Sequence, residues 1–217
     1  MRTGVHKEFK QETLDRYARL IEPCVDDPWK WIQVAYPWGE KGTPLEGKRP
    51  HAWQKAAAKH IARQLKGMRS GSIPEGPVRL ARRSGHGIGK SAFMSMIVGW
   101  CLGTMTDARG VVTANTDTQL RGKTWPEVGK WHRMSISYPF FNHNATTLRS
   151  IEADHTTSWS AEAVPWSENN PDAFQGLHNA GKRVVILFDE ASGIPPIIWE
   201  SIEGAMTDAD TQVIWIV

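Results

Sequence analysis

At 217 residues, of which 40% are hydrophobic and 23% are charged, the chain has the composition of a globular protein and not of a disordered one. The length suits one sizeable α/β domain with a short additional element, and the net charge of +3 is too small to indicate a nucleic-acid partner by itself. The sequence contains no apolar run of about 18 residues, so it predicts no membrane-spanning helix.

The two cysteines, Cys24 and Cys101, show neither the spacing of a metal site nor a disulfide framework. This pattern favours two buried thiols in a reducing cytoplasm. The N-terminus also lacks the apolar stretch of a secretory signal peptide. Eleven Trp residues are unusual for this length, and we expect them in a core, in contacts between subdomains or on a partner surface.

In chain order, the first predicted element is a charged helix over residues 7–21. A Trp-rich segment punctuated by Pro follows, and its second half is predicted to be a loop. An amphipathic helix is predicted over 51–68, because apolar residues recur every four positions from Trp53 onward. Its opposite face carries four basic residues, Lys55, Lys59, Arg63 and Lys66. These could contact a DNA backbone, but a solvated surface is the favoured interpretation. We therefore expect an N-terminal helix and Trp-rich arm over 1–50, followed by an α/β core over 51–217.

Short apolar strands alternate with helices in that core, which is typical of an α/β fold with a central, mostly parallel sheet flanked by helices. The predicted strands are VRLARRS at 78–84 and the segments 110–115, 184–190 and 211–217. The predicted helices cover 91–103, a segment starting near Thr118, and 195–206. Residues 147–165 favour a β-hairpin or a short insertion. Because the last strand ends the sequence, we expect an unpaired sheet edge beside it, as in a truncated domain.

A Gly-rich turn between the first predicted strand of the core and the next helix indicates a phosphate-binding loop. It follows the P-loop pattern G-x-x-x-x-G-K-[ST], with Ser84 in place of the first Gly. Its glycines allow the positive φ that such a loop needs, and its backbone N–H groups would point at the β-phosphate of a nucleotide. Lys90 would reach the β- and γ-phosphates, and the Ser91 hydroxyl would hold Mg²⁺. The predicted nucleotide-binding residues of this loop are Ser84, Gly85, His86, Gly87, Ile88, Gly89, Lys90 and Ser91.

Two adjacent carboxylates end the apolar strand at 184–190, and they favour hydrolysis as well as binding. Asp189 is the natural partner of the metal ion, and Glu190 is the natural general base for the attacking water. Taken alone, the pair would be interpreted as exposed strand-end acids. Its combination with the P-loop 99 residues earlier, counted from Lys90 to Asp189, makes the catalytic interpretation the favoured one.

Residues outside these two motifs carry weaker hypotheses. Gln54 could hydrogen-bond an adenine edge with Trp53 stacking nearby, although a core Trp and a solvated Gln explain the pattern equally well. Arg82 and Arg83 follow the first strand of the core, where one of them could offset the charge of the γ-phosphate and the other would lie on the surface. The histidines show no metal-ligand spacing.

Three segments together resemble the ATPase domain of tailed-phage large terminases, the motors that pump DNA into procapsids. They are SGHGIGKS, VVTANTDTQLRGKTWPEVGKW and VVILFDEASGIPPIIWESIEGAMTDADTQVIWIV, and the resemblance covers about residues 50–217. It implies a P-loop NTPase with an additional strand between the two motifs, which VVTAN would supply, and a catalytic Glu after the metal-binding Asp. It implies ATP and Mg²⁺ as cofactors, and it places Trp53 and Gln54 in the adenine-contacting segment.

The same resemblance implies partners and a location. They are double-stranded DNA, the portal protein, the small terminase subunit and further copies of the chain in a ring, at the procapsid portal in the bacterial cytoplasm and with no membrane. The sequence departs from the pattern where many terminases carry an Arg in the P-loop, because His86 stands there. It also has Gln175 before Gly176 where many carry an arginine finger, so a finger would come from Arg121, Arg149 or Arg183.

The family's nuclease domain and coupling motif have no counterpart in these residues, so DNA cleavage is not expected from this chain. Two other interpretations stay open. The chain could be another P-loop ATPase of helicase-like or AAA type, or an inactive nucleotide-binding fragment of a prophage.

Overall fold

A seven-stranded sheet forms the centre of the computed structural model, which describes residues 9–83, 85, 87–166, 179–205 and 211–217. Within these residues the strand order is β1-β7-β6-β2-β5-β4-β3. Strands β1, β7, β6, β2 and β5 are parallel, whereas β4 and β3 are antiparallel to their neighbours. The strands are β1 (Val78–Leu80), β2 (Arg109–Ala114), β3 (Phe141–His143), β4 (Thr147–Ser150), β5 (Ser160–Ala163), β6 (Arg183–Asp189) and β7 (Gln212–Ile216). The predicted α/β class and mostly parallel sheet are confirmed.

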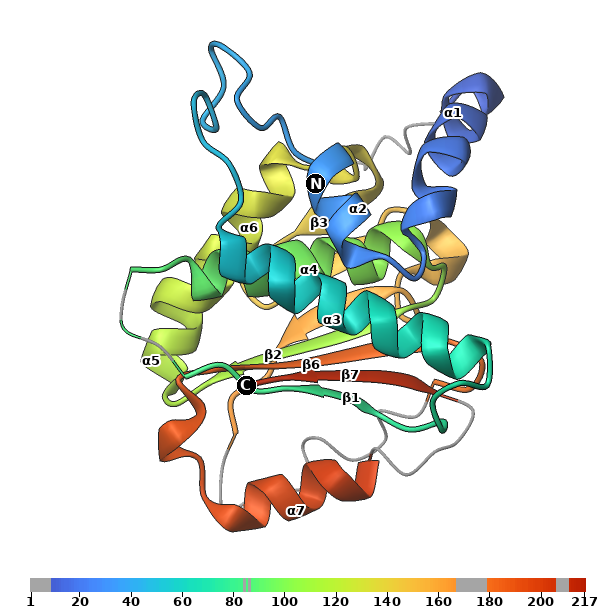
Figure 1. Cartoon of the computed structure of the whole chain (residues 1–217). Coiled ribbons are helices and arrows are strands. Elements are labelled where there is room, and N and C mark those ends of the chain that lie inside the picture. Colours follow the sequence, from blue (N-terminus) through green and yellow to red (C-terminus); the bar gives the residue numbers. More distant parts are fainter. Residues whose placement is uncertain (1–8, 84, 86, 167–178, 206–210) are drawn as a thin grey trace.

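Helices cover both faces of this sheet (Figure 1). Helices α3, α4 and α6 lie over one face, and α7 lies over the other. The helices are α1 (Gln11–Ile21), α2 (Pro28–Val34), α3 (Ala52–Arg69), α4 (Lys90–Thr104), α5 (Asp117–Gln119), α6 (Trp125–Met134) and α7 (Pro196–Ala205). A π-helical turn, Leu120–Thr124, joins α5 to α6.

Strand β6 lies at the middle of the structure, and all seven of its residues are buried. Val185 and Leu187 belong to the core beneath α4, whereas Val184 and Ile186 belong to the core beneath α7. Burial on both faces explains why the residues between Arg183 and Asp189 are continuously apolar instead of alternating. It also holds the last residue of β6, Asp189, on a rigid element.

Most predicted elements are found close to their expected positions. The helix expected over 51–68 is α3, and the strands expected at 110–115, 184–190 and 211–217 are β2, β6 and β7. Residues 147–165 form a pair of antiparallel strands, as expected, but β5 also pairs with β2 in parallel, so this hairpin extends the main sheet. The first half of the Trp-rich segment contains a helix, α2, that the sequence analysis had not separated from the rest.

Two expectations about the sheet are wrong. The last strand, β7, does not leave an unpaired edge, because it lies between β1 and β6 and is hydrogen-bonded to both. The second wrong expectation is that VVTAN supplies the additional strand between the two motifs. The strand that lies between the motif-bearing strands, β1 and β6, is β7. The VVTAN strand, β2, lies on the far side of β6. Sequence order does not specify this arrangement, since parallel strands need not be neighbours in the order in which they occur.

The Trp-rich segment before residue 50 packs directly on α4. The Trp31 ring lies fully buried against Gly99 and Gly103 of α4, where an added Cβ would overlap with aromatic side chains of the segment. Cys24 and Cys101 are free thiols and both are buried, as expected. In the described residues, no helix combines the length and the apolar character needed to cross a membrane.

The buried His132 on α6 should make the stability of the fold sensitive to acid. Its ring is buried and its Nε2 lies 3.1 Å from the carbonyl oxygen of Phe141, a contact that a neutral ring makes by donating its proton. Burial lowers the pKa of His132 to about 4 from an ordinary value of 6.5. The contribution of neutral His132 to the free energy of unfolding is therefore fully present above the ordinary pKa. It decreases as the pH falls from about 6.5 toward about 4, because in this range only the unfolded chain binds the proton.

We expect this histidine to remove about 2 kcal/mol from the free energy of unfolding between about pH 7 and about pH 5. Urea denaturation at several pH values measures the slope. His132→Gln, whose amide can donate to the same carbonyl, is expected to have a shallower slope, and equal slopes would show that the acid sensitivity arises elsewhere.

Candidate nucleotide-binding site

The Gly-rich turn lies between β1 and the N-terminus of α4, at the carboxyl edge of the parallel strands (Figure 1). Gly87 and Gly89 have φ of 77° and 82°, in the left-handed region that residues with a Cβ rarely adopt. A Cβ on Gly89 would also lie 3.0 Å from the Gln54 amide nitrogen. The loop therefore requires Gly at this position for two reasons. It leads into the N-terminus of α4, and the free N–H groups at the start of a helix can bind an anion.

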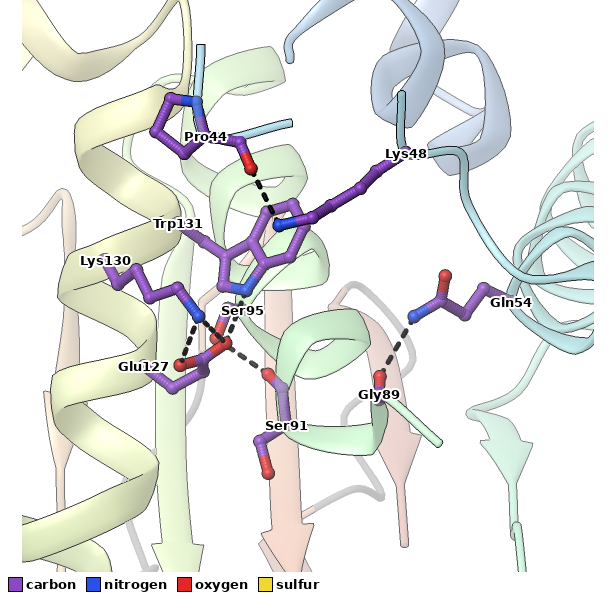
Figure 2. Close-up of polar contacts among 9 residues, drawn as sticks. All are labelled: Pro44, Lys48, Gln54, Gly89, Ser91, Ser95, Glu127, Lys130 and Trp131. Atoms are coloured by element: carbon purple, nitrogen blue, oxygen red, sulfur yellow. Dashed lines mark hydrogen bonds and ion pairs between the residues drawn. The ribbon is translucent and has the colours of Figure 1, made fainter. Parts of the chain in front are cut away.

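Two side chains of helix α3 donate hydrogen bonds to backbone carbonyls of this loop. The Trp53 indole N–H donates to the carbonyl of Ile88 at 2.9 Å, and the Gln54 amide N–H donates to the carbonyl of Gly89 at 2.9 Å. Figure 2 shows the second contact at the start of α4. The Gln54 side-chain oxygen accepts the backbone N–H of His51 at 2.8 Å, so both ends of the buried amide are engaged within the protein.

Asp189 lies beside the first turn of α4. Its Oδ2 accepts the Ser91 hydroxyl at 3.1 Å, which joins the two sequence motifs across 98 residues. The same oxygen accepts the hydroxyl of Thr124, from the π-helical turn, at 2.8 Å. Within α4, the Ser91 carbonyl also accepts the Ser95 hydroxyl at 2.7 Å (Figure 2). The sequence analysis did not identify Thr124, because a single Thr inside a helix-like segment carries no pattern.

Glu190 is exposed at the end of β6 and adopts φ 55° and ψ 50°. A left-handed conformation is uncommon for a residue with a Cβ and costs about 1–2 kcal/mol. Such strain is found at functional sites more often than elsewhere. The turn directs the chain away from the sheet immediately after Asp189, so the two carboxylates have different surroundings: one is buried and hydrogen-bonded and the other is open to solvent.

A cavity of about 650 Å³ opens between these elements. Its volume is in the range of small-molecule sites, about 300–1,000 Å³. The predicted site residues that line it are Trp53, Arg83, Lys90, Asp189 and Glu190. Arg82 and Asn115 line it as well, and the Arg82 guanidinium lies 5.7 Å from the centre of the Trp53 ring. The surroundings thus combine cations, carboxylates and one aromatic face.

Comparison with known proteins adds to this geometry. No family model matches the chain. A curated protein of Enterobacteria phage P7, named as a probable terminase, large subunit, is 24% identical over 202 residues, which are 90% of this chain and 38% of that protein. The similarity is to phage large terminases. The resemblance drawn from the motifs is confirmed, and the chain spans less than half the length of the phage P7 relative.

Solved structures give the fold. The crystal structure of the large terminase of bacteriophage HK97 superimposes with a TM-score of 0.54 over 88% of this chain and 37% of its own, at 13% identity. The large terminase ATPase domain of Thermus phage P74-26 is 21% identical, with a TM-score of 0.44 over 78% of this chain and 65% of its own. Over the part that superimposes, the chain has the fold of the HK97 large terminase.

Several predicted residues fall outside the described part of the chain or in unexpected surroundings. Ser84, His86, Gln175 and Gly176 lie outside the described residues. Among the finger candidates, Arg121 and Arg149 are exposed. The suggestion that Arg183 could act as a finger is wrong, because its side chain is fully buried at the opposite end of β6 from Asp189.

The residues around Asp189 fit a magnesium ion by their chemistry. The described residues contain no group of three or more His, Cys, Asp or Glu that could hold a metal ion. Mg²⁺ needs no such group, since it is commonly bound by one or two oxygen ligands together with water and substrate phosphates. The Asp189 carboxylate, which lines the cavity, and the Ser91 hydroxyl, 3.1 Å from it, supply such oxygens.

Proposed function

We propose that the chain is the ATPase motor region of a DNA-packaging terminase and that it hydrolyses ATP with Mg²⁺ in the cavity beside α4. The observation that carries this proposal is the hydrogen bond between Ser91 and Asp189, at the start of a Gly-capped helix and next to Glu190. A P-loop hydroxyl, a buried carboxylate and an exposed carboxylate at one sheet edge are the parts that nucleoside triphosphate hydrolysis needs.

Each residue has a role that follows from its position. The N–H groups at the start of α4 and the Lys90 ammonium would bind the β- and γ-phosphates. Ser91 and Asp189 would hold Mg²⁺, which when bound offsets the phosphate charge that develops during transfer. Glu190, exposed at the edge of the cavity, would orient water for in-line attack and accept its proton. Arg83 is placed to contact a phosphate, and Trp53 to contact the base.

The partners of such a motor are part of the same proposal and rest on the resemblance to terminases. They are double-stranded DNA as the translocated substrate, a portal protein, a small terminase subunit and neighbouring copies of the chain in a ring, in the cytoplasm of a bacterial host. Because a ring would complete the site from a neighbouring copy, we expect slow turnover from the isolated chain.

We expect ATP with Mg²⁺ to stabilise the protein, since a ligand that binds only the folded state at 100 times its Kd adds about 2.7 kcal/mol. For a chain of this size the melting temperature should rise by roughly 5–10 °C. Thermal-shift titration measures this effect, and phosphate release then separates hydrolysis from binding alone.

Lys90→Ala should weaken ATP binding about 10- to 100-fold, because it removes a charged contact to the phosphates. Lys59→Ala, on the exposed face of α3, serves as the matched control. Absence of any ATP-dependent shift in the unsubstituted protein would overturn the proposal. Binding without phosphate release, in concentrated protein with DNA present, would instead indicate a non-hydrolysing nucleotide-binding module.

A further inference from the structure

The π-helical turn Leu120–Thr124 places a buried hydroxyl on the carboxylate that the proposed function assigns to the metal ion. Thr124 has an exposed fraction of 2%, and its Oγ1 donates to Asp189 Oδ2 at 2.8 Å. The turn lies between α5 and α6 and packs on β2, the neighbour of β6 in the sheet. Wide helical turns of this kind are rare and occur frequently at functional sites.

The residues on either side hold Thr124 in place. Leu120 is fully buried and Trp125 is almost so. The Trp125 indole N–H donates to the carbonyl of Asn144 at 2.9 Å, and its ring stacks on the His143 ring at 5.2 Å. The Thr124 hydroxyl therefore has little freedom to turn to another acceptor, and its contact with Asp189 is set by the packing of the whole turn.

Both hydroxyls on Asp189 reach the same oxygen, Oδ2. Two donors on one carboxylate oxygen occupy both of its lone-pair directions and so set the plane of the group. The two donors are not equivalent: Ser91 is in the P-loop, where its oxygen would itself face the metal ion, whereas Thr124 belongs to neither motif. Residues that orient a metal ligand from outside matter, since their removal commonly lowers metal affinity about 10- to 100-fold.

We propose that Thr124 is a positioning residue, which orients the Asp189 carboxylate for a divalent cation bound together with nucleotide. This inference rests on the proposed function and adds to it a residue outside the P-loop and the strand-end acids. It assigns a role to the segment between α5 and α6, whose π-helical geometry brings a Thr hydroxyl to the end of β6.

The test measures the binding of a fluorescent ATP analogue to Thr124→Val across a range of Mg²⁺ concentrations and in EDTA. Val has nearly the same shape as Thr but cannot donate. We expect the Mg²⁺ concentration that gives half-maximal enhancement of binding to rise about 10- to 100-fold, while binding in EDTA changes by less than about twofold. Thr124→Ser keeps the donor and should restore the wild-type Mg²⁺ dependence to within about threefold.

Thr113→Val is the matched control, because Thr113 is also fully buried, on β2, and its hydroxyl has no hydrogen-bond partner among the described residues. It should bind the analogue with the wild-type Mg²⁺ dependence. Should Thr124→Val fail to fold, Thr124→Cys keeps the size and weakens the donor, and an intermediate Mg²⁺ dependence is then expected.

The outcomes separate this inference from the proposed function. In one outcome the wild-type protein binds the analogue with Mg²⁺ and a folded Thr124→Val protein shows the same Mg²⁺ dependence. This result would overturn the role of Thr124 and leave the proposed function standing. An equal loss of binding with Mg²⁺ and in EDTA would show general damage to the site and would also overturn it. A wild-type protein that binds no nucleotide would overturn the proposed function first, and the role of Thr124 with it.

Discussion

Replacing Glu190 with Gln is expected to reduce ATP turnover about 100- to 10,000-fold while leaving ATP affinity within about twofold, because a general base contributes roughly this factor to the rate. Gln has the size of Glu and can still hydrogen-bond water, but it cannot take the proton. The exposed position of Glu190 at the cavity edge makes it the carboxylate open to water, since Asp189 is buried under two hydroxyl groups. Phosphate release and the binding of a fluorescent analogue measure the two effects on the same protein preparation.

Glu200→Gln makes the same chemical change on an exposed residue of α7 and should leave turnover unchanged. Glu190→Gly tests the backbone as well, because a residue with φ 55° gains from the loss of its Cβ. The free energy of unfolding of that variant should be about 1 kcal/mol higher than that of the wild type, and the variant should still fail to turn over ATP. Undiminished turnover in Glu190→Gln would reject the assignment of the base.

The elements with a strong hydrophobic period were predictable from the sequence. Helix α3 carries apolar residues every four positions, and β6 is an apolar run that ends in a pair of acids, so their types and approximate bounds follow from residue pattern alone. The closeness of Ser91 and Asp189 was also predictable, because parallel strands that each precede a functional turn end at the same edge of a sheet.

Other features depend on contacts that no local pattern encodes. The position of β7 between β1 and β6 is decided by pairing between strands far apart in the sequence. For Gln54 the sequence pattern left open an adenine contact or a solvated position; in the structure its amide is buried and joins the start of α3 to the carbonyl of Gly89. Thr124 reaches Asp189 only because the chain makes a π-helical turn, and helix propensities do not distinguish such a turn from an α-helical one.

Arg183 shows the same limit most clearly, because this basic residue at the start of a strand was considered as an arginine finger and is instead fully buried. Its guanidinium lies 3.8 Å from the centre of the Trp100 ring and donates to the Thr104 hydroxyl at 2.9 Å. It also donates to the carbonyl of Val25 and to the side chain of Gln212. Burial lowers the pKa of Arg183 to about 10, so the group is still charged at neutral pH.

Four separate parts of the chain therefore converge on one buried cation: the segment before α2, helix α4, strand β6 and strand β7. Arg183→Met is expected to lower the free energy of unfolding by about 3–5 kcal/mol, because it leaves several buried acceptors without their donor and removes the positive charge that lies 3.8 Å from Asp26. Chemical denaturation measures the loss. Arg149→Met, on the exposed side of β4, should change stability by less than about 0.5 kcal/mol.

A double variant tests whether the N-terminal segment is bound to the core through this residue. Asp26 lies 3.8 Å from the Arg183 guanidinium and also pairs with Arg69 at 2.6 Å. If Arg183 joins these parts, the effects of Arg183→Met and Asp26→Asn should be less than additive, by at least about 0.5 kcal/mol. Strict additivity would show that the ion pair between Asp26 and Arg183 does not contribute to holding the N-terminal segment on the core. Wild-type stability in Arg183→Met would show instead that the buried charge contributes nothing, and that other contacts, among them Trp31 against Gly99 and Gly103, hold the segment on α4.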